Sequence, residues 1–138
     1  MTPDHVKLVK ESFAKVAPIA PQAAALFYGR LFEIAPEVKP LFKGDIAEQG
    51  RKLMQVLATA VNGLDDLPAL VPVVQDLGRR HVRYGVTDAH YGVVGEALLW
   101  TLGQGLGDGF TPAVKDAWVG VYIVLADTMK AAAKSAAA

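Results

Sequence analysis

The chain has 138 residues, which suits a single folded domain covering residues 1–138. Its 14 basic and 14 acidic side chains give a formal net charge of zero, so no overall field draws it to nucleic acid or to an anionic membrane. Cysteine is absent, which excludes disulfides, thiolate nucleophiles and metal centres held by thiolates.

The N-terminal residues lack the apolar segment of a secretory signal peptide. The longest apolar runs, such as VYIVLA, are much shorter than the roughly 18 residues that a membrane span needs. We therefore expect a cytoplasmic protein without a membrane span. Apolar residues make up 52% of the chain, which is more than a small domain usually carries, and part of this surplus could line a ligand cavity.

Helical periodicity, punctuated by proline, runs along the whole chain. The pairs Thr2-Pro3, Thr87-Asp88 and Thr111-Pro112 have the pattern of a helix N-cap followed by the first helical residue. Apolar residues then recur at spacings of three and four, as on the buried face of an amphipathic helix. The segments with this pattern begin near Pro3 and Pro21 and then cover about 46–62, 65–82, 87–106 and 111–134.

Two apolar runs, ALVPVV at 69–74 and VYIVLA at 121–126, have a composition that strands also show. However, no Asn-Gly type turn joins alternating segments, and the helical spacing continues through both runs. The sequence therefore predicts an all-α fold.

Three polar residues lie on the apolar faces of different predicted helices: Tyr28, Gln49 and His81. A buried hydroxyl, amide or imidazole without a partner costs roughly 1 to 3 kcal/mol. Three such residues suggest either hydrogen bonds among them or a shared polar ligand inside an apolar pocket. Each also has a simpler interpretation. Tyr28 could pack its ring inside and donate to a backbone carbonyl, and Gln49 could be exposed or cap its helix locally.

His81 lies in the run LGRRHVRYG, where neighbouring Arg79, Arg80 and Arg83 disfavour the charged imidazolium. A neutral imidazole is a good metal ligand, and its Nδ1 proton could bond to the carbonyl of Leu77 and aim Nε2 into a pocket. The simpler interpretation is a core histidine with satisfied hydrogen bonds, since the chain offers no second and third ligand for a bare zinc site. A metal that brings most of its own ligands, as in haem, needs only this one.

Four segments resemble the single-domain bacterial haemoglobins and the globin domain of the flavohaemoglobins. They are LFYGRLFEIAPEVKPLF (26–42), QGRKLMQVLATAVNGLDDLPALVPVVQDLGRRH (49–81), HYGVVGEALLWTLG (90–103) and DAWVGVYIVLAD (116–127). The resemblance implies a globin fold, a three-over-three helical sandwich around haem b, with a very short or absent helix D after Phe42.

By the same resemblance, His81 matches the proximal iron ligand and Phe42 matches the phenylalanine that stacks on the haem. Tyr28 and Gln49 match the two distal positions that contact a bound gas, with Leu53 one turn beyond Gln49. Further haem contacts implied by position are Lys52 and Arg80, near the propionates, together with Val56, Leu77, Tyr91, Val94 and Leu98.

These residues imply a protein that reversibly binds dioxygen, and also NO and CO, for oxygen transport or storage. Oxygen on ferrous haem takes on superoxide character, so each hydrogen-bond donor aimed at it is worth about 1.5 to 3 kcal/mol. Donors at Tyr28 and Gln49 should therefore give slow release. Leu53, Val56 and Leu98 would form an apolar shell that excludes water.

The resemblance also leaves an enzyme open, nitric oxide dioxygenase. The chain ends at Ala138 without the flavin and nicotinamide domains of flavohaemoglobins, so turnover would need a separate reductase. Flavohaemoglobins carry a late glutamate that, with a tyrosine matching Tyr91, bonds the proximal histidine; Ala133 stands there, which favours gas binding over catalysis. A haem-free interaction or sensor module is a third alternative, against which His81, Phe42, Tyr28 and Gln49 together argue.

Overall fold

The computed structural model describes residues 3–42, 45–83 and 85–137, with side chains described for all of these except Arg83 and residues 135–137. All regular structure in this part of the chain is helical, as the sequence predicted. The α-helices are α1 (Pro3–Val16), α2 (Ala20–Ile34), α3 (Ile46–Asn62), α4 (Leu67–Arg83), α5 (Asp88–Leu106) and α6 (Pro112–Ala137). Short 3₁₀ helices join them: η1 (Ala17–Ile19), η2 (Pro36–Leu41), η3 (Gly63–Asp65) and η4 (Gly107–Gly109).

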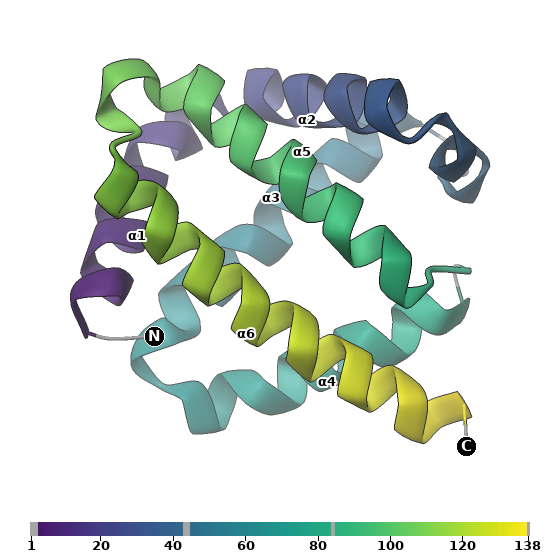
Figure 1. The fold of residues 1–138 in the computed structure, drawn as a ribbon. Helices are drawn as coiled ribbons and strands as arrows, with labels where there is room; N and C mark the ends of the chain where they lie inside the picture. The colour runs from purple at the N-terminus through teal and green to yellow at the C-terminus, as the bar shows by residue number, and fades with distance from the viewer. Residues whose placement is uncertain (1–2, 43–44, 84, 138) are drawn as a thin grey trace.

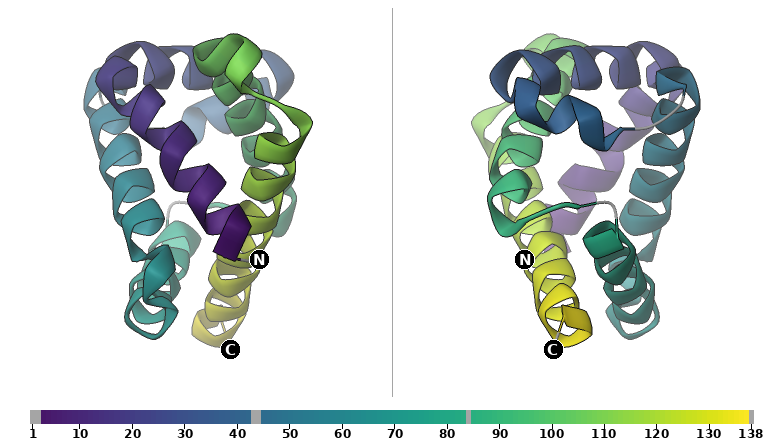
Figure 2. Two further views of the ribbon diagram at one scale, coloured as in Figure 1. Left: turned by 90° about the vertical axis from the view of Figure 1, so that its left-hand side faces the viewer. Right: turned by 90° about the vertical axis from the view of Figure 1, so that its right-hand side faces the viewer.

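The helices form two layers, α1, α3 and α4 over α2, α5 and α6 (Figure 1). Across the layers, α4 and α1 pack on α6, and α3 packs on α2; within one layer, α2 packs along α5. Figure 2 shows α1 lying between α3 on one side and α6 on the other. The predicted three-over-three arrangement is therefore confirmed.

Hydrogen bonds to side chains cap the first turns of several helices, as the N-cap patterns predicted. The Thr111 hydroxyl accepts from the backbone N–H of Val114 at 3.3 Å, at the start of α6. At the start of α5 the backbone N–H of Thr87 donates to Nδ1 of His90 at 3.0 Å, a bond that the sequence interpretation had missed. Thr2 lies outside the described residues. Pro72 lies inside α4, and Pro40 lies inside the 3₁₀ helix η2.

The connection from α2 to α3 is short, as expected. Only residues 42–45 separate η2 from α3, and both Phe42 and Asp45 have extended backbone. The Asp45 carboxylate accepts from the backbone N–H of Ala47 at 2.9 Å and caps α3. The prediction of a very short or absent helix D is therefore confirmed.

A single apolar core joins the helices, and one buried polar contact crosses it. The Trp118 indole N–H of α6 donates to the Ser12 hydroxyl of α1 at 2.8 Å, and Ser12 donates to the carbonyl of Leu8 at 2.7 Å. The indole and the hydroxyl thus satisfy each other inside the core. Among the described helices, none is both long and apolar enough to cross a membrane.

Candidate functional site

His81 lies in the last turn of α4 and is half-buried. Its Nδ1 is 2.7 Å from the carbonyl oxygen of Leu77, one turn earlier, as predicted. Since a carbonyl only accepts, Nδ1 carries the proton and Nε2 carries the lone pair of the neutral ring. This bond fixes both the tautomer and the direction of the ring, which is the arrangement that metal-ligating histidines use.

The pKa of His81 is lowered from its ordinary value. Burial is the largest cause, the hydrogen bond to Leu77 opposes it, and the charge of Arg80 lowers the pKa further. The neutral form that the sequence predicted is therefore the stable one at neutral pH. The cause is partly different, because burial outweighs the arginines. The side chain of Arg83 lies outside the described residues.

Arg80 itself points to the outer surface of α4. Its Nε is 3.1 Å from Oδ2 of Asp76, one turn earlier, in an exposed i,i+4 ion pair. Such a pair contributes little to stability, so the arginine can exchange it for another anion. Lys52 is exposed on α3. A contact of either side chain with a propionate stays a prediction.

The position of α4 depends on a residue that the sequence interpretation had missed, Gly78. A Cβ at this position would lie 2.5 Å from the carbonyl oxygen of Met129 and 2.7 Å from its Cα. The backbone of α4 therefore lies directly on the backbone of α6, three residues before His81. The available signal was the glycine itself, because glycine inside a helix is destabilising unless close packing requires it.

Tyr28 is buried on α2 in a cluster of aromatic rings. Its ring centroid is 5.1 Å from that of Phe27, 5.9 Å from Phe32 and 5.3 Å from Phe42. Burial raises the pKa of Tyr28 to about 12, so the hydroxyl keeps its proton. No hydrogen bond joins the hydroxyl to another group in the described part of the chain, whereas the ring packs inside as the simpler interpretation also predicted. The structure thus brings Tyr28 and Phe42 together.

Gly50 brings α3 against α2 beside the same tyrosine. A Cβ on Gly50 would lie 2.9 Å from Cβ of Ala24 and 3.9 Å from Cε2 of Tyr28. Gln49, next in the chain, is half-buried, and its backbone N–H donates to the carbonyl of Asp45 at 3.1 Å within the first turn of α3. The close crossing places the two predicted distal residues on helices that touch.

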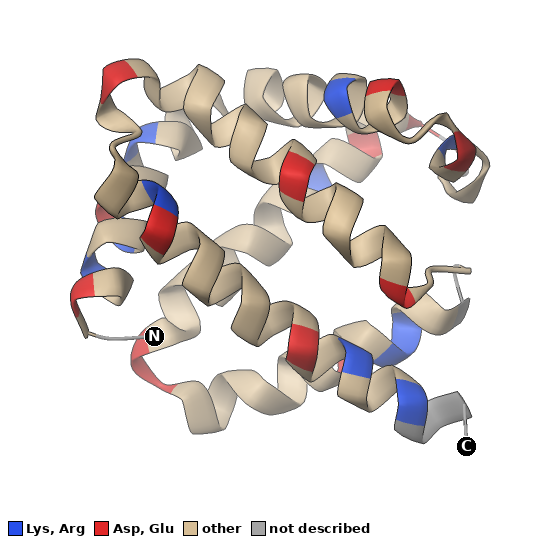
Figure 3. Ribbon diagram, in the orientation of Figure 1, with Lys and Arg blue, Asp and Glu red and all other residues tan. Residues whose placement is uncertain are grey.

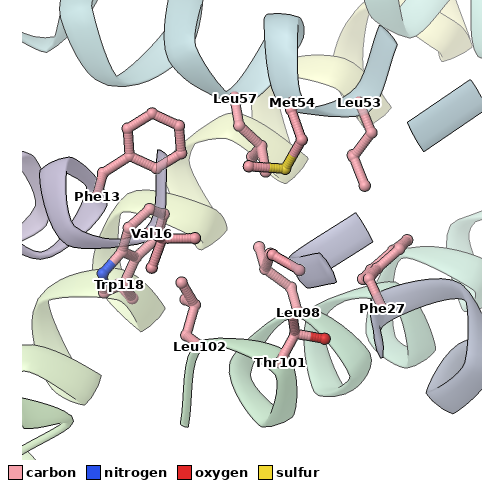
Figure 4. A pocket seen from close by; sticks show the side chains of 11 residues that line it. Phe13, Val16, Phe27, Leu53, Met54, Leu57, Leu98, Thr101, Leu102 and Trp118 are labelled. Atoms are coloured by element: carbon pink, nitrogen blue, oxygen red, sulfur yellow. The ribbon is translucent and has the colours of Figure 1, made fainter. Parts of the chain in front are cut away.

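Two of the three predicted shell residues meet at one small void. Leu53 of α3 and Leu98 of α5 both line it, and Figure 4 shows their side chains pointing toward each other across it. The Thr101 hydroxyl at its edge donates to the carbonyl of Ala97 at 2.8 Å, which leaves the void apolar. Val56 is not among the lining residues and is 38% exposed.

Tyr91 is buried at the start of α5, and Val94 is half-buried one turn later. The Tyr122 hydroxyl of α6 donates to the backbone carbonyl of Tyr91 at 2.7 Å, and the Lys130 ammonium lies 5.6 Å from the centroid of the Tyr91 ring. Burial is the main cause that raises the pKa of Tyr91, followed by the charge of Asp88. These contacts hold Tyr91 against α6, and its predicted contact with the histidine side of the site is not tested.

The donor set and the packing both fit a haem group. No cluster of three or more histidine, aspartate or glutamate side chains exists among the described residues, so His81 suits a metal that carries its other ligands with it. α3 has its main contacts with α2, and α4 has its main contacts with α6. Both helices leave apolar side chains partly exposed, including Leu53, Val56 and Leu77, as a flat apolar group between them requires.

Comparisons with known proteins point to one family. The family model described as Globin matches residues 25–129, a range that contains every site residue predicted from the sequence. A flavohaemoprotein of Vibrio cholerae is 30% identical over 91% of this chain, which spans only 33% of that protein. A neuroglobin of Chaenocephalus aceratus is 30% identical over 89% of this chain and 86% of its own length.

The role of Gly78 can be tested by Gly78→Ala. The new methyl group would meet the backbone of Met129, so α4 must move away from α6. We expect the free energy of unfolding to fall by about 1 to 3 kcal/mol, as for other overpacked positions, measured by denaturant titration. Gly92→Ala is the control, because nothing lies within 4 Å of a Cβ there, and it should be neutral or stabilising. Equal effects of the two changes would contradict the close contact.

Proposed function

Because the chain belongs to the globin family, whose members hold haem and bind gaseous ligands, we propose that it holds haem b through His81 and reversibly binds dioxygen, in oxygen transport or storage. NO and CO are further ligands on this proposal. The observation that carries it is the imidazole of His81, which is held by the carbonyl of Leu77 and kept neutral by burial.

When bound, haem supplies the iron that takes up a diatomic gas. The protein supplies the groups around that gas. Tyr28 contributes a protonated hydroxyl that is buried among aromatic rings and bonded to no described group, so it can donate to the ligand. Gln49 is the second proposed donor, on the helix that crosses beside Tyr28 at Gly50. Leu53 and Leu98, which line one apolar void, are the residues proposed to exclude water from the ligand.

The remaining residues have proposed roles in holding the group itself. The Phe42 ring, which meets the rings of Tyr28 and Phe32 edge to face, would stack on the haem. Lys52 and Arg80 would meet the propionates at the surface, where both side chains are exposed. The other proposed haem contacts are apolar or aromatic: Val56, Leu77, Tyr91 and Val94.

We also propose a closer relationship, to the subgroup of bacterial globins that includes Hell's Gate globin. The runs RKLMQVL at 51–57 and LGRRH at 77–81 support it. The second run contains both Gly78, which sets α4 on α6, and His81. A cytoplasmic location belongs to the same proposal.

A second candidate function is nitric oxide dioxygenase, working with a separate reductase. The similarity to a flavohaemoprotein favours it, because the name of that relative indicates a protein that binds both flavin and haem. The sequence of α6 argues for gas binding instead, because it contains no glutamate and has Ala133 at the position expected for one. The Nδ1–H group of His81 donates to the neutral carbonyl of Leu77. A carbonyl polarises the N–H bond less than a carboxylate would, so the imidazole has less imidazolate character.

The variant His81→Gly tests the axial ligand. We expect it to lose haem on gel filtration and to show no Soret band, because the proposed axial ligand is removed. Added imidazole should restore the band by filling the space that the side chain leaves. His90→Ala is the control: His90 caps α5, so this variant should keep its haem. A full Soret band in His81→Gly without imidazole would refute the assignment.

The variant Tyr28→Phe tests the distal donor. Loss of a hydrogen bond worth about 1.5 to 3 kcal/mol should speed oxygen release roughly ten- to a hundredfold, measured by stopped-flow displacement. Tyr122→Phe is the control, since it removes a part-buried tyrosine hydroxyl that donates to the carbonyl of Tyr91 instead. An unchanged release rate in Tyr28→Phe would mean that the hydroxyl does not face the ligand.

The two candidate functions differ in turnover. We expect the oxygenated protein, mixed with excess nitric oxide and a supplied reductant, to form about one nitrate per haem, because each nitrate formed would leave ferric iron that must be reduced again before the next turnover. Nitrate is measured against haem concentration. Many turnovers, sustained without loss of the haem spectrum, would instead establish the dioxygenase.

A further inference from the structure

The small apolar void beside α3 and α5 contains one heteroatom that has no role in the fold, the sulfur of Met54. Among the described side chains that line the void, three carry a heteroatom: Met54, Thr101 and Trp118. The Thr101 hydroxyl donates to the carbonyl of Ala97 at 2.8 Å, and the Trp118 indole N–H donates to the Ser12 hydroxyl at 2.8 Å. Figure 4 shows the sulfur of Met54 pointing from α3 into the void. The thioether is therefore available for chemistry.

Met54 is the more accessible of the two methionines that the structure describes. The chain has three methionines and no cysteine, so thioethers are its only sulfur groups. Met1 lies outside the described residues. Met129 is 9% exposed and belongs to the core, whereas Met54 is half-buried and packs against the core from its edge. Met54 therefore combines access from solvent with a position at the void.

A peroxide converts a thioether to a sulfoxide by transferring one oxygen atom to the sulfur. The S–O bond forms as the O–O bond breaks, the sulfur loses two electrons, and the second oxygen of the peroxide leaves as water. The product is polar and chiral where methionine is apolar, and cellular reductases can reverse the change. The reaction needs no second residue of the protein.

The void cannot satisfy an added oxygen atom. Its volume is about 10 Å³, close to the least that holds one water molecule, so a single oxygen atom would fill it. α3 has no charged residue from Leu53 to Asn62, and Figure 3 shows its charges near the start of the helix. The polar residues of this half of α3, Gln55, Thr59 and Asn62, are all exposed. A sulfoxide oxygen in the void would therefore face apolar side chains without a hydrogen-bond donor, which is unfavourable.

From this arrangement we propose that Met54 is a site of modification by peroxide, and that the oxygen atom added to its sulfur loosens the packing of α3 on the core. α3 also carries Gln49 and Leu53, which belong to the proposed distal side, so the modified protein should release dioxygen faster. This last consequence rests on the proposed function, whereas the oxidation of Met54 and the loss of stability do not. Peroxide thus acts on the distal side through packing and not through a group that contacts the ligand.

Peptide mapping after treatment with hydrogen peroxide tests the modification. The purified full chain is first saturated with carbon monoxide, so that any bound iron does not consume the peroxide, and catalase ends the reaction. Trypsin places Met1, Met54 and Met129 in separate peptides, 1–7, 53–79 and 116–130, so mass spectrometry scores each residue alone. We expect Met54 to be oxidised roughly tenfold faster than Met129, because it is more exposed. Equal rates, or faster oxidation of Met129, would overturn the proposal.

Unfolding and ligand release test the effect on packing. After oxidation we expect a lower midpoint of denaturant unfolding and a several-fold faster release of dioxygen. Met54→Leu should show neither change, because leucine keeps the apolar volume but cannot be oxidised. Met129→Leu is the matched control, since it removes the other described methionine and should leave the response to peroxide as in the wild type.

The outcomes separate this proposal from the proposed function. An unchanged unfolding midpoint in a chain whose Met54 is fully oxidised overturns the proposal, as does a response that persists in Met54→Leu. An unchanged release rate in the oxidised, haem-loaded protein overturns the effect on the distal side. A chain that takes up no haem refutes the proposed function instead, and the peptide map and the unfolding midpoint still decide the role of Met54.

Discussion

The contact between the backbones of α4 and α6 at Gly78 is the constraint on which the candidate site depends. Because Gly78 has no side chain, the backbone of α4 lies directly against the Cα and carbonyl atoms of Met129 in α6. A shift of α4 along α6 would bring a side chain into this contact and cause a clash. His81 follows three residues later, and its ring is held from the same turn by the carbonyl of Leu77. A local hydrogen bond therefore orients the imidazole, and a long-range backbone contact sets where the imidazole lies.

The opposite side of the site is built in the same way. Gly50 lets α3 approach α2 until its backbone is close to Ala24 and Tyr28, and the aromatic cluster around Tyr28 then includes Phe42 from the following connection. Burial shifts the pKa values of His81 and Tyr28, on the two sides of the site, in opposite directions. It lowers the pKa of His81 and leaves a lone pair to give, whereas it raises the pKa of Tyr28 and leaves a proton to give. One apolar environment thus produces a lone-pair donor suited to a metal and a hydrogen-bond donor suited to a polar ligand.

The sequence predicts the parts of this arrangement that depend on near neighbours. Proline positions and apolar spacing located the helices, and the bond from His81 to Leu77 followed from an i,i+4 relationship within one helix. The same reasoning could have found the ion pair of Arg80 with Asp76, which has the same spacing. It could not find the contact of Gly78 with Met129, because nothing in either local pattern identifies a partner fifty residues away. The role of burial in the pKa of His81 was missed for the same reason, since burial is set by the packed helices and not by the neighbouring arginines.

The two faces of α6 impose separate demands on its sequence. The inner face must supply small and apolar groups to the core and a bare backbone to Gly78, and Met129 serves both purposes. The outer face has no part in that packing, and Ile123 there, at 51% exposure, contributes only part of its transfer free energy to folding. Lys130 follows Met129 directly and lies over the ring of Tyr91, so this turn of α6 contacts α4 through its backbone and the start of α5 through its side chain. The turn of α6 that supports α4 before His81 is therefore also the turn that contacts Tyr91.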